Sequence, residues 1–241
     1  MNILGISAGF HDAAAAVINQ HGDILFAGHS ERYSKKKNDA DINLELVQEI
    51  VQWPIDHVAY YERPWLKQLR SLRAGQGIDW SSITLGQVLK KQLPGMKHIP
   101  STSTHNHHLC HAAAGFQTSP YDRATVVVID AIGEFDTISI WGAEYDKKGQ
   151  AKYTRLWGQK YPHSIGLFYS AITQRVGLHP LDEEYITMGM SAWGRPHWYQ
   201  TMHNNLIDDD AEVRFRENLH LGIDPNYLSF ASNEEDRKSV V

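Results

Sequence analysis

The stretch ATVVVIDAIGEFDTISIWGAEY, residues 124–145, indicates the fold class most directly. Residues 124–129 are β-branched and apolar at both odd and even positions, which predicts a strand that is covered on both faces. An acidic, glycine-containing turn leads into a second strand at 137–145, and after another turn a third strand begins at residue 151. This order of strands and short turns predicts an antiparallel meander.

A similar order occurs at the start of the chain, where we expect strands at 2–7, 14–18 and 24–31. The apolar spacing then predicts a helix at 43–52, a strand at 55–62 and a helix at 83–93. Helices and strands that alternate after a three-stranded meander are typical of a ribonuclease-H-like lobe. Because the meander occurs twice, we predict an α/β chain with two lobes, 1–122 and 123–241.

Composition excludes several classes of protein. The chain has 241 residues, and 23 Lys and Arg against 28 Asp and Glu give a net charge of −5, which argues against a nucleic-acid partner. One cysteine, Cys110, excludes an intramolecular disulfide and a four-cysteine zinc site. The amino terminus lacks a basic segment, and no stretch approaches the ~20 apolar residues of a membrane span. We therefore expect a cytoplasmic protein with no membrane partner.

Two histidines four residues apart, His107 and His111, are a candidate metal site. If 108–116 is helical, both side chains lie on one helix face, a spacing that lets two imidazoles bind one cation. Asp130 follows the strand predicted at 124–129, at the edge where α/β sheets place site residues. Two imidazoles and a carboxylate suit Fe(II), Zn or Mn.

A second interpretation of the same stretch has no metal. In it His105, His107 and His108 are loop residues, and His111 is a partly buried histidine whose hydrogen bonds are satisfied. A zinc protease of the HExxH type is excluded, because the position of its glutamate is occupied by His108.

Three further segments are candidates for a binding site. His11 and Asp12 are a titratable pair in a turn that contains Gly9, although a simple polar hairpin has the same pattern. Residues 130–134 form a second acidic turn of the kind that offers backbone N–H groups to phosphate. The Gly- and Met-rich segment 183–194 fits either the core or a ligand-lining loop.

Taken together, several stretches resemble the O-carbamoyltransferases of the NodU/CmcH/TobZ family. In the family's order they are ILGISAGFHDAAAAVI, SERYSKKKND, HNHHLCHAAAGFQTSPYDRATVVVIDAIGEFDT, SIGLFYSAIT and EEYITMGMSAWGRP, and they cover most of residues 1–196. The resemblance implies actin-like (ASKHA) lobes, the second of them incomplete, and a YrdC-like domain that is absent from this chain. It also implies that carbamoyl phosphate and ATP give carbamoyladenylate, whose carbamoyl group passes to the hydroxyl of a small acceptor.

The resemblance also assigns roles to individual residues. It implies a divalent metal, Fe(II), held by His107, His111 and Asp130. It implies that His11 and Asp12 are catalytic, and that Gly133 and Glu134 line the nucleotide side of the site. Two departures matter: Ile186 stands where the family has lysine, and a further aspartate ligand lies in a part of the family with no counterpart here.

Three functions therefore stay open. The first is carbamoyl transfer, with a YrdC-like domain or chain supplied in trans. The second is a catalytically idle remnant or accessory subunit that keeps the fold and binds a partner protein. The third is another ASKHA protein, such as a phosphotransferase, but such proteins use a phosphate turn rich in Asp, Gly and Thr or Ser, whereas this chain has GFHD at 9–12.

Overall fold

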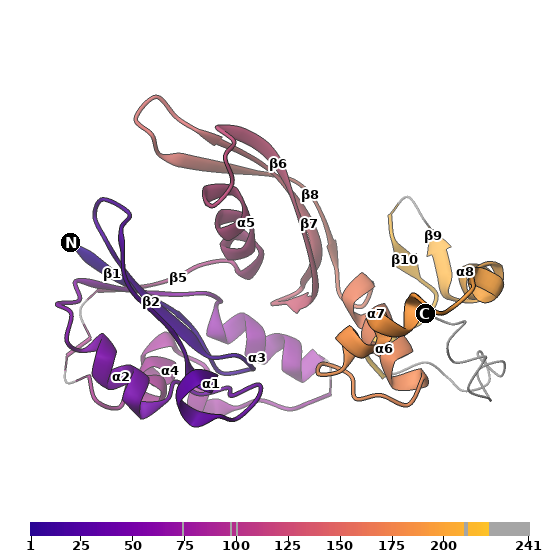
Figure 1. Ribbon diagram of the computed structural model, residues 1–241, viewed down its shortest axis with the longest axis horizontal. Helices are drawn as coiled ribbons and strands as arrows, with labels where there is room; N and C mark the ends of the chain where they lie inside the picture. The colour runs from indigo at the N-terminus through magenta and orange to yellow at the C-terminus, as the bar shows by residue number, and fades with distance from the viewer. Residues whose placement is uncertain (74, 97, 100, 210–211, 222–241) are drawn as a thin grey trace. The chain divides into compact units, whose positions relative to one another are not determined.

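The chain forms two compact units in a computed structural model, Met1–Cys110 and His111–Val241, and each is described by itself (Figure 1). The structure describes residues 1–73, 75–96, 98–99, 101–209 and 212–221. The division between the units comes earlier than the predicted boundary at 122. Residues 222–241 of the predicted second lobe lie outside the described residues.

The first unit is built on a five-stranded sheet of strand order β3-β2-β1-β4-β5. The strands are β1 (Asn2–Ser7), β2 (Ala14–Asn19), β3 (Ile24–His29), β4 (His57–Tyr60) and β5 (Ser101–Thr104). The first three form the antiparallel meander that the sequence predicts, while β4 pairs parallel with both β1 and β5. The helices are α1 (Ser30–Ser34), α2 (Leu44–Ile50), α3 (Pro64–Arg73) and α4 (Leu85–Gln92), with a 3₁₀ turn at Trp80–Ser82.

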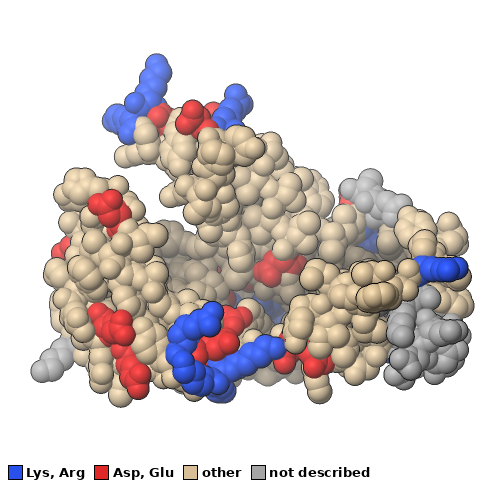
Figure 2. Space-filling view, in the orientation of Figure 1, with Lys and Arg blue, Asp and Glu red and all other residues tan. Residues whose placement is uncertain are grey.

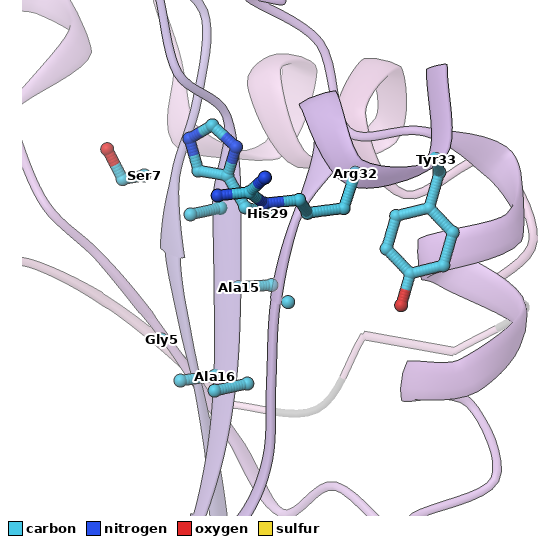
Figure 3. A pocket seen from close by; sticks show the side chains of 10 residues that line it. Gly5, Ser7, Ala15, Ala16, His29, Arg32 and Tyr33 are labelled. Atoms are coloured by element: carbon cyan, nitrogen blue, oxygen red, sulfur yellow. The ribbon is translucent and has the colours of Figure 1, made fainter. Parts of the chain in front are cut away.

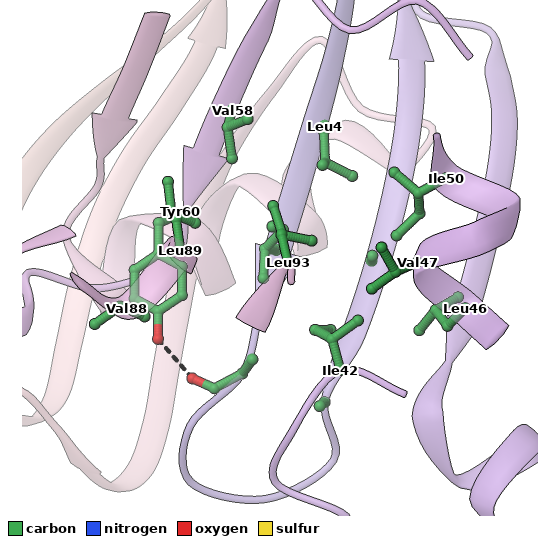
Figure 4. Close-up of a cluster of buried hydrophobic side chains, with 14 of the residues drawn as sticks. Leu4, Ile42, Leu46, Val47, Ile50, Val58, Tyr60, Val88, Leu89 and Leu93 are labelled. Carbon is green, nitrogen blue, oxygen red and sulfur yellow. Dashed lines mark hydrogen bonds between the residues drawn. The ribbon is translucent and has the colours of Figure 1, made fainter. Parts of the chain in front are cut away.

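The core of the first unit lies between one face of this sheet and the helices α2 and α4 (Figure 4). Strand β1 alternates, so that Leu4 and Ile6 are buried while the residues between them lie on the other face. Helix α2 adds Leu46 and Ile50, and α4 adds Leu89, all fully buried. Period-two strands and period-3.6 helices thus meet on one apolar layer, as the sequence predicts.

The second unit contains a three-stranded antiparallel sheet of order β6-β7-β8, formed by β6 (Arg123–Gly133), β7 (Asp136–Tyr145) and β8 (Ala151–Lys160). This is the second meander predicted from the sequence. Most of helix α5 (His107–Gln117) belongs to this unit, together with α6 (Ile165–Arg175), α7 (Glu184–Ser191) and α8 (Tyr199–Leu206). The unit also contains β9 (Ile207–Asp209), β10 (Arg214–Phe215) and 3₁₀ turns at Pro196–Trp198 and Leu219–Leu221. A separate apolar cluster joins Ile172 of α6 and Val176, which directly follows this helix, to Leu206, Phe215 and Leu219.

Strand β6 corrects one prediction. The sequence predicts that 124–129 is covered on both faces, but Val127 and Ile129 are each 56% exposed. Val and Ile are also enriched in strands that are buried on one face only, so a run of them does not by itself indicate burial on both faces. The α/β class and both meanders are confirmed, and the actin-like assignment stays a prediction.

The surface and the helix lengths give two further facts. On the face shown in Figure 2, Lys and Arg side chains lie beside Asp and Glu rather than forming a broad basic area. Within the described part of the chain, every helix is too short or too polar to cross a membrane.

Candidate functional site

Helix α5 (His107–Gln117) carries the two histidines of the predicted metal site. Asn106 precedes it, and its Oδ1 accepts a hydrogen bond of 3.0 Å from the backbone N–H of Leu109, as an N-cap residue does. The division between the units falls inside α5, so His107 and His111 are parts of one helix. Gly115 lets the helix approach Val126 of β6, with 3.9 Å to its Cγ1 from where a Cβ would stand.

The structure brings His107, His111 and Asp130 together. One donor atom from each side chain lies within 4.8 Å of the other two. His111 is exposed, whereas His107 Nδ1 and Asp130 Oδ2 are shielded from solvent. The geometry therefore offers two imidazole nitrogens and one carboxylate oxygen on a partly buried, partly open site.

The sequence predicts that Asp130 follows the end of its strand, but β6 continues to Gly133. The pairing of β6 with β7 is interrupted between Ile129 and Gly133, and Asp130 lies in this irregular stretch. Its Oδ1 accepts a bond of 2.7 Å from the N–H of Ala131. Irregular strand pairing of this kind re-aims a side chain away from the regular alternation.

Helix α6 fixes the backbone at Asp130. The Ser164 hydroxyl donates to the carbonyl oxygens of Asp130 (3.1 Å) and Ala131 (2.7 Å), and it accepts a bond from Leu167 N–H as the helix cap. Next to it Gly166 lies so close that a Cβ there would be 2.7 Å from the Cα of Ala131. The backbone that carries the Asp130 carboxylate is therefore held by the first turn of α6.

Gly133 and Glu134, predicted to line the nucleotide side, lie at the turn between β6 and β7. Gly133 pairs with Asp136, so Glu134 and Phe135 form a two-residue hairpin loop. Glu134 is buried and has a φ of 59°, which is uncommon for a residue with a side chain. Asp136 accepts two bonds of 2.9 and 2.8 Å from the guanidinium of Arg155, which holds the turn to β8.

His11 and Asp12 lie in the loop between β1 and β2 of the first unit. His11 Nδ1 is 2.7 Å from Asp12 Oδ2, and both side chains are about half exposed. Gly9 (φ 92°) and Asp12 (φ 51°) both have left-handed backbone, as the glycine in the turn suggests. The N–H groups of Gly9 and Ala13 each donate a bond of 2.7 Å, to Ala40 O and Asp39 O respectively.

The side chains of Tyr60 and Lys67, which lie outside this loop, donate hydrogen bonds to its backbone. The Tyr60 hydroxyl donates a bond of 2.6 Å to the carbonyl oxygen of Ala8 (Figure 4). Burial raises the pKa of the Tyr60 phenol well above its usual value, and the charge of Glu62 adds to this, so the hydroxyl stays a donor. Lys67 Nζ donates to the carbonyl oxygen of Gly9 (3.1 Å) and to Glu62 Oε1 (2.9 Å).

Replacing Tyr60→Phe is expected to lower the free energy of unfolding by about 1 kcal/mol, since a buried hydrogen bond to Ala8 is lost. Urea unfolding followed by circular dichroism measures this loss. Tyr33→Phe is the matched control, because the Tyr33 hydroxyl donates to Glu49 in an exposed pair; its effect should stay within about 0.5 kcal/mol. Equal losses in the two variants would contradict the role given to Tyr60.

His105 and His108, the other two histidines of this stretch, lie in different environments. His105 is exposed, and its Nε2 is 2.9 Å from the hydroxyl of Ser103 in β5, so it belongs to the polar segment before α5. His108 is fully buried within α5. The interpretation of His107 and His108 as loop residues is therefore wrong, because α5 begins at His107.

Helix α7 covers most of the Gly- and Met-rich segment. Tyr185 and Met188 are exposed in it, and Trp193 just beyond it is 82% exposed. The prediction of a core segment is therefore wrong for these three side chains. Ile186, which stands where the resembling family has lysine, is partly buried in the same helix.

Sequence reasoning missed a second cluster in the first unit, formed by Asp12, His29 and Glu31. The predicted strand 24–31 did not indicate this cluster, because in the structure β3 ends at His29 and Glu31 lies in helix α1. The pairing register of β2 and β3 explains the cluster. Ala14 pairs with His29, so the end of β3 lies beside the turn that holds Asp12.

Comparison with known proteins matches the chain to one family. Residues 80–233 match the family described as "Carbamoyltransferase N-terminus". An uncharacterized protein of Synechocystis, sll1178, is 34% identical over 90% of this chain and 39% of its own length. The nodulation protein NolNO of Sinorhizobium fredii is 26% identical over 88% of this chain and 32% of its own length.

The chain thus spans about two fifths or less of the length of these two relatives. A solved structure, YeaZ from Pseudomonas aeruginosa, aligns with this chain at a TM-score of 0.35 and 12% sequence identity. The alignment covers 66% of this chain and 68% of the YeaZ chain. The family match covers well over half of the chain, including α5, Asp130 and the turn at Glu134. The chain belongs to the family of carbamoyltransferase amino-terminal domains, as the resemblance of its motifs predicted.

Proposed function

We propose that this chain takes part in carbamoyl transfer from carbamoyladenylate to the hydroxyl of a small acceptor. The observation that carries the proposal is the cluster of His107, His111 and Asp130, whose donor atoms lie within 4.8 Å of one another in a member of the carbamoyltransferase family. The match of residues 80–233 to the family described as "Carbamoyltransferase N-terminus" adds support.

The donor set fits a divalent transition metal, and we propose Fe(II). Two imidazoles and one carboxylate leave coordination positions for water or substrate, and this mixed set is one that Fe(II) favours. The shielded positions of His107 Nδ1 and Asp130 Oδ2 reduce competition from water. When bound, such an ion supplies Lewis-acid polarisation of a substrate oxygen.

His11 and Asp12 are proposed as the proton-handling pair. Asp12 Oδ2 faces His11 Nδ1, so the neutral ring carries its proton on Nδ1 and its lone pair on Nε2. Nε2 then accepts the proton of the acceptor hydroxyl as its oxygen bonds to the carbamoyl carbon. The bond from that carbon to the phosphate oxygen breaks, and AMP leaves with the electron pair.

Glu134 and Gly133 are proposed to line the nucleotide. The buried turn gives backbone groups a fixed direction, which suits a group that binds and orients rather than reacts. Formation of carbamoyladenylate from ATP and carbamoyl phosphate is assigned to a YrdC-like domain or chain acting in trans.

The metal assignment is tested with Fe(II) alone under reducing, anaerobic conditions. Fe(II) should bind to the full chain, and His107→Ala or Asp130→Asn should each lose one equivalent. His105→Ala is the matched control, because His105 is exposed and lies outside the cluster. Metal content after gel filtration measures the result. Full binding by the His107 and Asp130 variants would refute the assignment.

The transfer assignment needs a second experiment. A YrdC-like domain, ATP and carbamoyl phosphate are supplied with a panel of hydroxylated acceptors, and carbamoylated product is detected by mass spectrometry. We expect product only when the chain is present, and a loss of product in His11→Ala with Fe(II) binding intact. Product at the level of the YrdC-like domain alone would contradict transfer.

An accessory subunit is the second candidate. Its favouring observation is the uncovered apolar surface at Val127, Ile129 and Leu156, of which Leu156 is 60% exposed. Chain-dependent product excludes an idle subunit, whereas Fe(II) binding without product supports it.

A further inference from the structure

We propose that Asp12, His29 and Glu31 form a second divalent transition-metal site, in the first unit. One donor atom from each of the three side chains lies within 4.8 Å of the other two. His29 Nε2 is 3.7 Å from Asp12 Oδ1, while the other oxygen of the same carboxylate, Oδ2, faces His11. All three side chains are partly buried.

The backbone holds the three residues in place without a metal. Ala14 pairs with His29, and the N–H of Ser30 donates a bond of 2.8 Å to Ala13 O, which ties the end of β3 to the loop that carries Asp12. Ser30 is fully buried, and its hydroxyl accepts a bond of 2.9 Å from Asn43 N–H. Ligands on such a fixed frame lose little entropy when they bind an ion.

The donor chemistry selects the class of ion. Two carboxylates place two negative charges close together, and an imidazole completes the set. A divalent cation removes the repulsion between the carboxylates, and the imidazole favours Zn, Mn, Co or Fe over Mg and Ca. Ligands of one ion at ~2.1 Å lie roughly 3 Å apart, so small side-chain rotations close the cluster.

An independent feature gives such an ion room for a further ligand. His29 also lines an open pocket of about 640 Å³ (Figure 3). Its floor is made by small residues on the face of the sheet opposite the core: Gly5, Ala14, Ala16 and Ala27. Arg32 lies beside His29 in the same pocket (Figure 3), and a guanidinium next to a metal suits a small anion such as a carboxylate or phosphate.

The site is distinct in its residues from the one proposed at His107, and the experiment keeps the two apart. The background is the full chain with His107→Ala and Asp130→Asn, in which the first proposed site is removed. Co²⁺ alone is titrated into it by calorimetry. We expect one equivalent to bind, and His29→Ala or Glu31→Gln to weaken this binding at least about tenfold.

Two controls match the chemistry of the removed ligands. His21→Ala removes an exposed histidine from the turn between β2 and β3, and Glu45→Gln removes an exposed glutamate from α2. Both should bind Co²⁺ as the background does. Co²⁺ should also raise the thermal midpoint of the background and leave that of His29→Ala unchanged, which separates lost binding from lost folding.

The outcomes are decisive in either direction. Binding by the background that His29→Ala and Glu31→Gln abolish supports the second site, whatever happens at His107. No binding by the background, or binding that these two variants leave unchanged, overturns it. If the site proposed at His107, His111 and Asp130 is wrong, the single variant His107→Ala binds as much Fe(II) as the unchanged chain.

Discussion

Lys67→Met is expected to lower the free energy of unfolding by about 3–5 kcal/mol, because it leaves Glu62 as a buried charge without its cation. The Glu62 side chain is only 6% exposed and that of Lys67 16%. Methionine keeps most of the length and the apolar stem of lysine, so the loss reports the ammonium group, which donates to Glu62 and to the carbonyl oxygen of Gly9. Urea unfolding measures the energy, and hydrogen exchange of β1 and β4 amides locates it in the first unit.

An exposed pair provides the control. Lys91 lies 3.4 Å from Asp41, and both side chains are more than half exposed. Lys91→Met should therefore cost less than about 1 kcal/mol. The double variant Lys67→Met, Glu62→Gln should recover part of the loss, because the buried charge is gone. Similar costs for the two lysine variants would show that the Glu62 pair is not effectively buried.

Gly166→Ala is expected to destabilise the second unit by about 3 kcal/mol, since its Cβ would overlap the backbone of β6. The nearest atoms are the Cα and N of Ala131 at 2.7 Å and the carbonyl oxygen of Asp130 at 2.8 Å. Backbone atoms cannot turn aside as a flexible side chain does. Either α6 moves outward or the Asp130 segment moves, and we expect either shift to weaken the Fe(II) binding proposed at His107, His111 and Asp130.

Gly189→Ala is the matched control in helix α7. Among the described residues, no atom lies within 4 Å of a Cβ placed there, apart from the helix backbone and chain neighbours. Alanine should stabilise the helix by about 0.5–1 kcal/mol, as it does in most helix interiors. Thermal unfolding and Fe(II) content are compared for both variants. A Gly166 variant as stable as the Gly189 variant would refute the close packing of α6 on β6.

The sequence predicts the parts of this fold in which apolar spacing and burial agree. Strands β1 and β2 of the first meander and helix α4 show that agreement. Helix α3 lacks it, because Trp65, Leu69 and Leu72 are about half exposed while Gln68 is buried. Its pattern of burial is the reverse of the usual amphipathic helix, so apolar periodicity gives no guide to which face packs.

The candidate site, too, can be predicted only in part from the sequence. Spacing alone places His107 and His111 on one helix face, and the structure has that helix. The closeness of Asp130 depends on the irregular pairing of β6 and on Ser164, neither of which a linear pattern contains. The cluster at His29 depends on the register between β2 and β3, which only a pairing prediction supplies.

Strand β5 has a consequence for how the protein behaves in concentrated solution. It is an outer strand of its sheet, only four residues long, and every side chain is Ser or Thr. Two of its hydroxyls, those of Ser101 and Ser103, lie 2.8 and 2.7 Å from the two ring nitrogens of His57. An edge this short and polar gives an incoming strand little apolar surface to join, which protects the sheet against aggregation by edge-to-edge pairing.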